Sequence, residues 1–180
     1  MFTQKTVVMK TFPIFLLTLI LISGFAKADP PEPPVNLKET IVHGTTIKIM
    51  AHSNDEYLRI DKRLVKAAGN DANYHRLMIE KVAGKEGDGL LHNGDTFVLR
   101  YADRKNYFHI DGGYLASGAS DRAATRFVIE KPGRYSEEIR SGDRVKIRSV
   151  EGDKYWSLHD KTVRWHSNRS GAHIFVLLID

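Results

Sequence analysis

One segment of the chain occurs three times without a gap. The first copy spans residues 43–81, the second residues 93–131 and the third residues 141–179. In each copy a glycine is followed 13 residues later by a tyrosine and then, 20 residues after that, by Leu or Phe. The glycines are Gly44, Gly94 and Gly142, the tyrosines are Tyr57, Tyr107 and Tyr155, and the last set is Leu77, Phe127 and Phe175. An offset that recurs in this way predicts three structurally equivalent units.

Each copy has the pattern of short strands. The segments TIKIMA, TFVLRYA and RVKIRSV alternate apolar and polar residues, which places every second side chain on one face. We expect inward-facing residues on four strands per copy. In the first copy these are Ile47 and Ile49, Leu58 and Ile60, Val65, and Leu77 and Ile79, with counterparts at the same offsets in the other copies. Turns rich in Gly, Asn, Asp and Ser separate the strands, and no amphipathic helix is predicted after Ala28.

The pattern predicts an all-β domain of twelve strands in three pseudo-equivalent four-strand repeats. An open sheet of that size would expose its edges, so closure around a pseudo-threefold axis is expected. The repeat unit has Gly before an apolar strand, Tyr-Leu, Tyr-Phe or Tyr-Trp at its centre, and Leu or Phe followed by x-Ile-Glu-Lys at its end, where the third copy has Leu178-Ile179 in place of Glu-Lys. This unit resembles the repeat of the β-trefoil superfamily, most closely its fascin-like branch. The resemblance covers residues 43–180 and implies a β-trefoil. The Gln-x-Trp signature of ricin-type trefoils is absent.

The first 28 residues have the features of a signal peptide. Lys5 and Lys10 precede the apolar run FPIFLLTLILISGFA, and Ala26-Lys27-Ala28 forms a cleavage signature. Translation starts at Met1 or Met9. The Pro-rich residues 29–42 are expected to be a tether, so the predicted organisation is a signal peptide (1–28), a tether (29–42) and the domain (43–180).

Composition narrows the class of protein. The chain has no cysteine, which excludes a disulfide framework and favours an exported bacterial protein, secreted or periplasmic. Removal of the signal peptide leaves 24 of the 27 basic residues against 22 acidic ones, so nucleic acid is not an expected partner. The mature form is expected to be a monomer without a membrane span, since the apolar run is shorter than a spanning helix.

The residues at equivalent positions of the three copies test which candidate catalytic or metal-binding groups recur. At the position of His109 the other copies have Arg59 and Ser157, and at the position of Asp111 they have Asp61 and His159. The His–Asp pair therefore does not recur. The spacing of His159, His166 and His173 does not by itself produce a zinc site, and His173 has a counterpart in His75 that indicates a shared structural position. No catalytic motif is present. We therefore predict no enzyme activity, no catalytic residue, no metal and no cofactor.

Trp165 breaks the repeat, because Ala67 and Ser117 occupy its position in the other copies. It either fills a gap at the end of the barrel or provides a stacking surface for a ligand. With Arg164, His166 and Asn168 it forms the predicted ligand-binding site. The third copy is also the most basic, which suits an acidic glycan or a phosphate-bearing partner.

The predicted function is that of an exported, non-enzymatic binding module for a glycan or a cell-surface ligand. The alternative is a protein–protein interaction module. Such a module would be a protease inhibitor, or an exported factor that engages a host protein such as actin, as the fascin-like resemblance implies.

Overall fold

The strands follow from the period-two pattern. The computed structural model describes residues 38–70, 72–84, 89–131 and 137–180, so the predicted signal peptide and residues 29–37 of the predicted tether lie outside the described residues. The strands are β1 (Thr46–Ala51), β2 (Glu56–Asp61), β3 (Leu64–Gly69), β4 (Leu77–Ala83), β5 (Thr96–Tyr101), β6 (Tyr107–Asp111), β7 (Tyr114–Ala119), β8 (Phe127–Glu130), β9 (Asp143–Ser149), β10 (Tyr155–His159), β11 (Thr162–His166) and β12 (Phe175–Ile179). Within the described ranges the helical elements are two 3₁₀ turns, η1 (Asp121–Ala123) and η2 (Arg169–Gly171).

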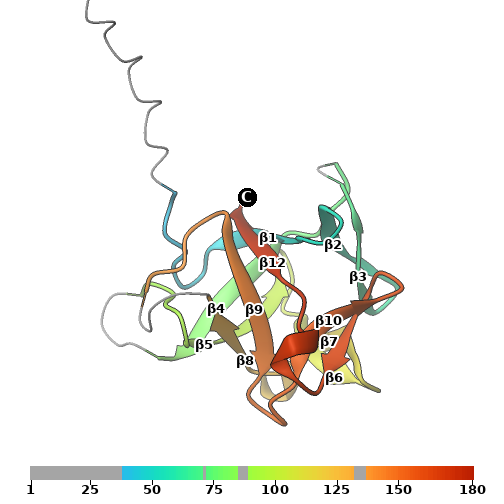
Figure 1. Ribbon diagram of the computed structural model, residues 1–180. Helices are drawn as coiled ribbons and strands as arrows, with labels where there is room; N and C mark the ends of the chain where they lie inside the picture. The colour runs from blue at the N-terminus through green and yellow to red at the C-terminus, as the bar shows by residue number, and fades with distance from the viewer. Residues whose placement is uncertain (1–37, 71, 85–88, 132–136) are drawn as a thin grey trace, which may run out of the picture. The chain divides into compact units, whose positions relative to one another are not determined.

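The strands join in one closed antiparallel barrel (Figure 1). Strand β1 pairs with β12, β12 with β9, β9 with β8, β8 with β5, β5 with β4, and β4 with β1, which closes the ring. The hairpins β2–β3, β6–β7 and β10–β11 are joined to one another through β3, β7 and β11. A closed ring leaves none of its own strands as an unpaired edge.

This pairing corrects the predicted architecture. The all-β class is confirmed, but the fold is a closed antiparallel β-barrel, and the prediction of a fascin-like β-trefoil with three four-strand repeats is wrong. The last strand of each copy forms its longest pairing with the first strand of another copy: β4 with β5, β8 with β9, and β12 with β1. A repeat offset shows which residues are equivalent, but it does not show which strands share hydrogen bonds.

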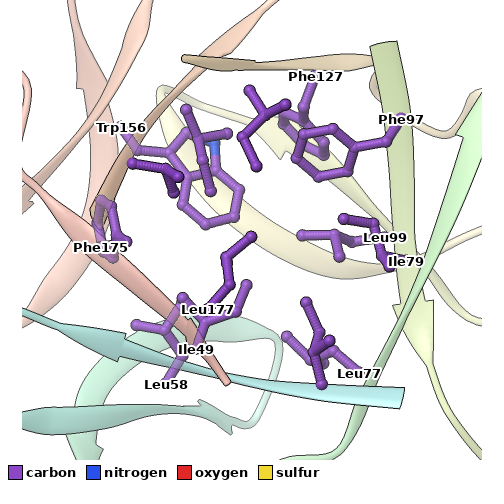
Figure 2. Packing of buried hydrophobic residues seen from close by; sticks show 14 of the residues in the cluster. Ile49, Leu58, Leu77, Ile79, Phe97, Leu99, Phe127, Trp156, Phe175 and Leu177 are labelled. Atoms are coloured by element: carbon purple, nitrogen blue, oxygen red, sulfur yellow. The ribbon is translucent and has the colours of Figure 1, made fainter. Parts of the chain in front are cut away.

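The inward faces form one continuous core (Figure 2). Phe127 and Phe175 each pack edge-on against Trp156, with ring centroids 5.3 and 5.5 Å apart, and Phe97 lies 5.8 Å from Phe127. The predicted inward residues of the first copy are buried, except that Ile60 is half-buried against the same core. Full burial of one such side chain contributes about 1.5–3 kcal/mol, so the core can hold the barrel without a disulfide.

Residues at the end of the predicted tether contact the barrel. Ile41 is fully buried in the core, Thr40 forms a β-bridge with Arg140, and Val42 forms one with Leu90. The backbone N–H of Ile41 donates to the carbonyl of Ile139 at 2.9 Å. Residues 40–42 of the predicted tether therefore pair with the barrel in the way strand residues do, although they follow the Pro-rich segment that ends at residue 34.

Two strand borders carry the same polar cluster. Glu80 accepts hydrogen bonds from Arg100 Nε (2.6 Å) and from the Tyr107 hydroxyl (3.1 Å). Glu130 accepts them in the same way from Arg148 Nε (2.8 Å) and from Tyr155 (3.1 Å). Burial, followed by the neighbouring glutamate, raises the pKa of both tyrosines. Tyr107 and Tyr155 thus combine a buried ring with a hydroxyl hydrogen bond to a glutamate.

Within the described part of the chain, no helix is long and apolar enough to cross a membrane.

Candidate functional site

One backbone position is built in the same way in all three copies. His75 Nδ1 accepts the backbone N–H of Ile60 at 3.0 Å, and His173 Nδ1 accepts that of Leu158 at 3.2 Å. In the second copy the Thr125 hydroxyl accepts the N–H of Ile110 at 3.1 Å. The predicted shared position of His75 and His173 is therefore confirmed, and its role is to satisfy a backbone donor.

A hollow of about 510 Å³ lies beside His75. Its lining comes from the start of β1, from the segment before β4 and from the end of β5 with the loop that follows. The lining residues are Thr46, Tyr74, His75, Arg76, Tyr101, Ala102, Asp103 and Arg104, and we call this the His75 hollow. A smaller hollow of about 390 Å³, the His173 hollow, lies at the equivalent position of the third copy. It is lined by His52, Ser53, Ser170, Gly171, Ala172, His173 and Ile174.

The two hollows share a backbone and differ in lining. At the same offsets, Tyr74 corresponds to Ala172, Arg76 to Ile174, Tyr101 to Ala51, Asp103 to Ser53 and Arg104 to Asn54. The second copy has Ala124, Arg126, Ser149, Glu151 and Gly152 there. The first position is therefore the one that combines aromatic side chains with charged ones. A few converging polar groups beside apolar surface are typical of a ligand site.

Tyr101 is the residue that most distinguishes the His75 hollow. It faces Leu77 across β4 and β5, whereas the equivalent pairs are Phe127 with Ser149 and Phe175 with Ala51. A smaller residue on one strand thus leaves space for the large ring on the other. Burial raises the pKa of Tyr101, and its ring lies 5.5 Å from that of His75 and is half-buried.

Charged groups hold the walls of the His75 hollow in place. The Asp180 carboxylate accepts from the Tyr74 hydroxyl and pairs with Arg76 Nε at 2.5 Å, and the Tyr74 hydrogen bond lowers its pKa. Arg100 Nη1 donates to the carbonyl of Tyr101 at 2.8 Å and to that of Ala102 at 3.3 Å, which fixes the start of the loop after β5. Asp103 and Arg104 are exposed at the rim.

His75 is neutral near pH 7. Desolvation, and then the charge of Arg59, lowers its pKa, and its Nδ1 can accept the Ile60 N–H only while it carries no proton. The ring therefore has one N–H, at Nε2. It can donate a hydrogen bond to a ligand, but its other nitrogen is committed to the backbone.

The structure separates Trp165 from the other predicted ligand residues, while His166 and Asn168 lie together, with the backbone N of Asn168 3.3 Å from His166 Nδ1. Trp165 is half-buried against the core and stacks on Phe127 with ring centroids 6.1 Å apart. Arg164 and His166 lie on the opposite face of β11, because side chains alternate along a strand. The Asn168 side-chain oxygen accepts from Gly171 N and Ser170 Oγ, both at 2.9 Å, so it caps η2.

The His109–Asp111 pair and the histidines of the third copy do not form a site either. His109 is half-buried on β6, and the Asp111 carboxylate lies 3.8 Å from Arg63 at an exposed position. Across the ranges that the structure describes, no three His, Cys, Asp or Glu side chains are arranged to hold a metal ion.

The sequence contains a signal for Tyr101 as well. The comparison that singled out Trp165 against Ala67 and Ser117 also singles out Tyr101 against Ala51 and Ser149. A large ring in place of two small residues occurs at both positions, and only the strand pairing shows which ring borders a hollow.

Comparison with known proteins adds information on the fold. Neither a protein-family model nor a curated relative matches the sequence. Similar solved structures include a Caenorhabditis elegans protein of unknown function, with 14% identity, a TM-score of 0.62 and coverage of 80% of this chain and 98% of that one. The SDF2-like protein of Arabidopsis thaliana is 15% identical, with a TM-score of 0.60 and coverage of 77% and 94%.

A third similar structure is the O-mannosyltransferase complex of S. cerevisiae bound to its sugar donor. It has 14% identity and a TM-score of 0.62, and the match covers 78% of this chain and 25% of that one. At these identities the similarity concerns the barrel alone. These structures do not indicate a fascin-like trefoil, which agrees with the correction from strand pairing.

Proposed function

We propose that the chain is a non-enzymatic binding module for a glycan or a cell-surface ligand that carries one, with the His75 hollow as the ligand site. The observation that carries this proposal is the asymmetry of the lining. Three equivalent positions share one backbone, and one of them has both aromatic rings and charged side chains. A fold that needed these residues for closure would be expected to have them in every copy.

The groups in the hollow suit a sugar. The C–H faces of a sugar ring pack on aromatic surface, which Tyr101 and Tyr74 supply. Its hydroxyls need several donors and acceptors at the rim, which Arg76, Asp103 and Arg104 supply. The S. cerevisiae O-mannosyltransferase complex, part of which resembles this barrel, is bound to a sugar donor, and this is in line with a glycan ligand.

The hydrogen bonds that His75 and Asp180 already make favour binding over catalysis. A general base needs a free lone pair within reach of its substrate. His75 Nδ1 is occupied by the Ile60 N–H, and the Asp180 carboxylate by Tyr74 and Arg76. These two groups therefore hold the hollow in shape. Export of the protein, to the periplasm or beyond the cell, stays a prediction from residues 1–28.

A glycan screen with a matched pair of variants tests the proposal. Asp103→Ala/Arg104→Ala removes the exposed rim of the hollow, and Asp121→Ala/Arg122→Ala removes the same two residue types from exposed positions on η1. We expect saturable binding of the native protein to a glycan, at least tenfold weaker binding for the first variant, equivalent to about 1.4 kcal/mol, and no change for the second.

Two results would contradict the proposal. A screen without any binding would overturn the function, and equal binding by both double variants would overturn the site. Circular dichroism of both variants checks that the exposed substitutions leave the barrel folded.

A further inference from the structure

A row of positive side chains runs along the outer face of β9. The strand alternates between buried and outward residues, so that Val145 and Ile147 are fully buried while Arg144, Lys146 and Arg148 point outward. Alternate residues of a strand lie about 6.6 Å apart, so the row spans about 13 Å. Its cations are held by a strand that pairs on both sides, with β8 and β12.

The row does not recur on the equivalent strands. At the same offsets β1 has Thr46, Lys48 and Met50, and β5 has Thr96, Val98 and Arg100. Each of those strands thus carries one cation at these three positions, against three on β9. The barrel closes through β1 and β5 without such a row, so closure does not require it.

Carboxylates compensate the row only at one end. Arg148 pairs with Glu130 at 2.8 Å and with the exposed Asp153 at 3.1 Å, while Arg169 pairs with the same Glu130 at 3.3 Å. Lys146 donates to the carbonyl of Arg169 at 2.9 Å. In the described ranges no ion pair joins Arg144 or Lys146 to a carboxylate, although Glu130 lies opposite Lys146 across β8 and β9. Like charges side by side repel, so this arrangement favours an anionic ligand.

The surroundings of the row indicate the shape of that ligand. On the neighbouring strands Val176 and Val128 lie opposite Arg144 and Arg148, and both are largely buried, while Glu130 lies opposite Lys146. The row is therefore a single line of charge on the outside of a barrel. A hollow of about 510 Å³ at its end is lined by three cations, Arg148, Arg169 and Lys131, and by the Glu130 carboxylate. A narrow extended chain with regularly spaced anions fits such a line better than a flat membrane or a wide duplex.

We propose that β9 and Arg169 form a second binding surface, separate from the His75 hollow, for an acidic polysaccharide carrying sulfate or carboxylate groups. Arg144 and Lys146 make the principal contacts, since neither takes part in an ion pair within the described ranges. The polysaccharide lies along the strand, with one anionic group near the hollow beside Arg148. Because the contacts are exposed ion pairs, affinity falls as ionic strength rises.

Heparin, with desulfated heparin as the comparison, is the probe that tests this surface. The variant Arg144→Gln/Lys146→Gln removes two charges from the row, and Lys62→Gln/Arg122→Gln removes two exposed charges of the same types from the β2–β3 turn and from η1. We expect native protein to bind heparin more tightly than its desulfated form, which keeps only the carboxylates. The Kd for heparin should be at least tenfold higher for the β9 variant and within twofold of native for the control.

Equal weakening by both double variants would overturn the proposal, because binding would then depend on the net charge of the protein and not on the position of the charges on β9. So would tighter β9-dependent binding to single-stranded DNA or to phosphatidylglycerol vesicles than to heparin. Thermal unfolding verifies that the exposed substitutions leave the fold intact. A Tyr101→Ala variant that loses glycan binding but keeps heparin binding would show that the two surfaces are independent.

Discussion

The His75 and His173 hollows differ in their side chains and not in their backbone. Both histidines accept a backbone N–H through Nδ1, and both donate their own backbone N–H to the neighbouring strand: His75 to Leu58 O at 3.3 Å and His173 to Trp156 O at 3.0 Å. The lining changes from Tyr101 and Arg76 to Ala51 and Ile174. The same backbone position can therefore carry different linings in different copies, because the barrel constrains only the inward residues and their hydrogen bonds, and in the first copy that lining forms the proposed ligand site.

Conversion of the first hollow into the third should have the largest effect. Tyr101→Ala is expected to cost about 2–4 kcal/mol of unfolding free energy, because a large ring that packs against Phe108 is lost. Adding Leu77→Phe recreates the Phe175–Ala51 pairing of the third copy and should recover more than half of that loss. Urea unfolding measures both variants.

Glycan binding separates the two roles of Tyr101. The double variant Leu77→Phe/Tyr101→Ala should regain stability and still fail to bind, since the aromatic surface of the hollow is absent. Recovery of both properties would show that Tyr101 serves packing alone. Failure of Leu77→Phe to restore any stability would show that the two pairs are not equivalent.

The shared histidine should show an intermediate effect that is similar in both copies. His75→Ala and His173→Ala each leave a backbone N–H without an acceptor, which costs about 1–3 kcal/mol when the group is shielded from water. His75→Thr and His173→Thr should lose less, because Thr125 already accepts the Ile110 N–H through its hydroxyl. A Thr variant as unstable as the Ala variant in urea unfolding would contradict this equivalence.

The pH dependence should be the smallest difference. The pKa of His75 is lowered on folding, so its stabilising effect is complete above its unfolded pKa of about 6.5 and is lost as pH falls below that value. Between pH 7 and pH 5, native protein should therefore lose more unfolding free energy than His75→Thr, which cannot titrate there. Carboxylates contribute equally to both proteins. Identical pH slopes in urea titrations would rule out a contribution from His75.

Much of the barrel was predictable from periodicity. The strands around Ile47, Phe97 and Val145 were expected from alternation, and the structure confirms their burial. Ile41 was missed, because a residue beside a Pro-rich segment shows no alternation of its own. Closure between β12 and β1 was not readable either, since pairing between distant strands depends on the whole ring.

The candidate site was less predictable than the fold. Comparison of the copies correctly drew attention to rings that replace small residues, but it led to Trp165, which stacks on Phe127 at the core. Tyr101 gives the same signal and borders a hollow. The two differ in what lies around each ring, and a single sequence does not report that.

The local order of residues settles which positions of this chain alternate, which are equivalent and which break the equivalence, because those properties depend on neighbours along the chain. Tertiary structure decides which strands pair, which of the positions that differ between copies faces solvent, and which cations of the described residues, such as Arg144, are not in an ion pair. Those outcomes depend on distances between residues far apart in sequence, and only the closed barrel sets them.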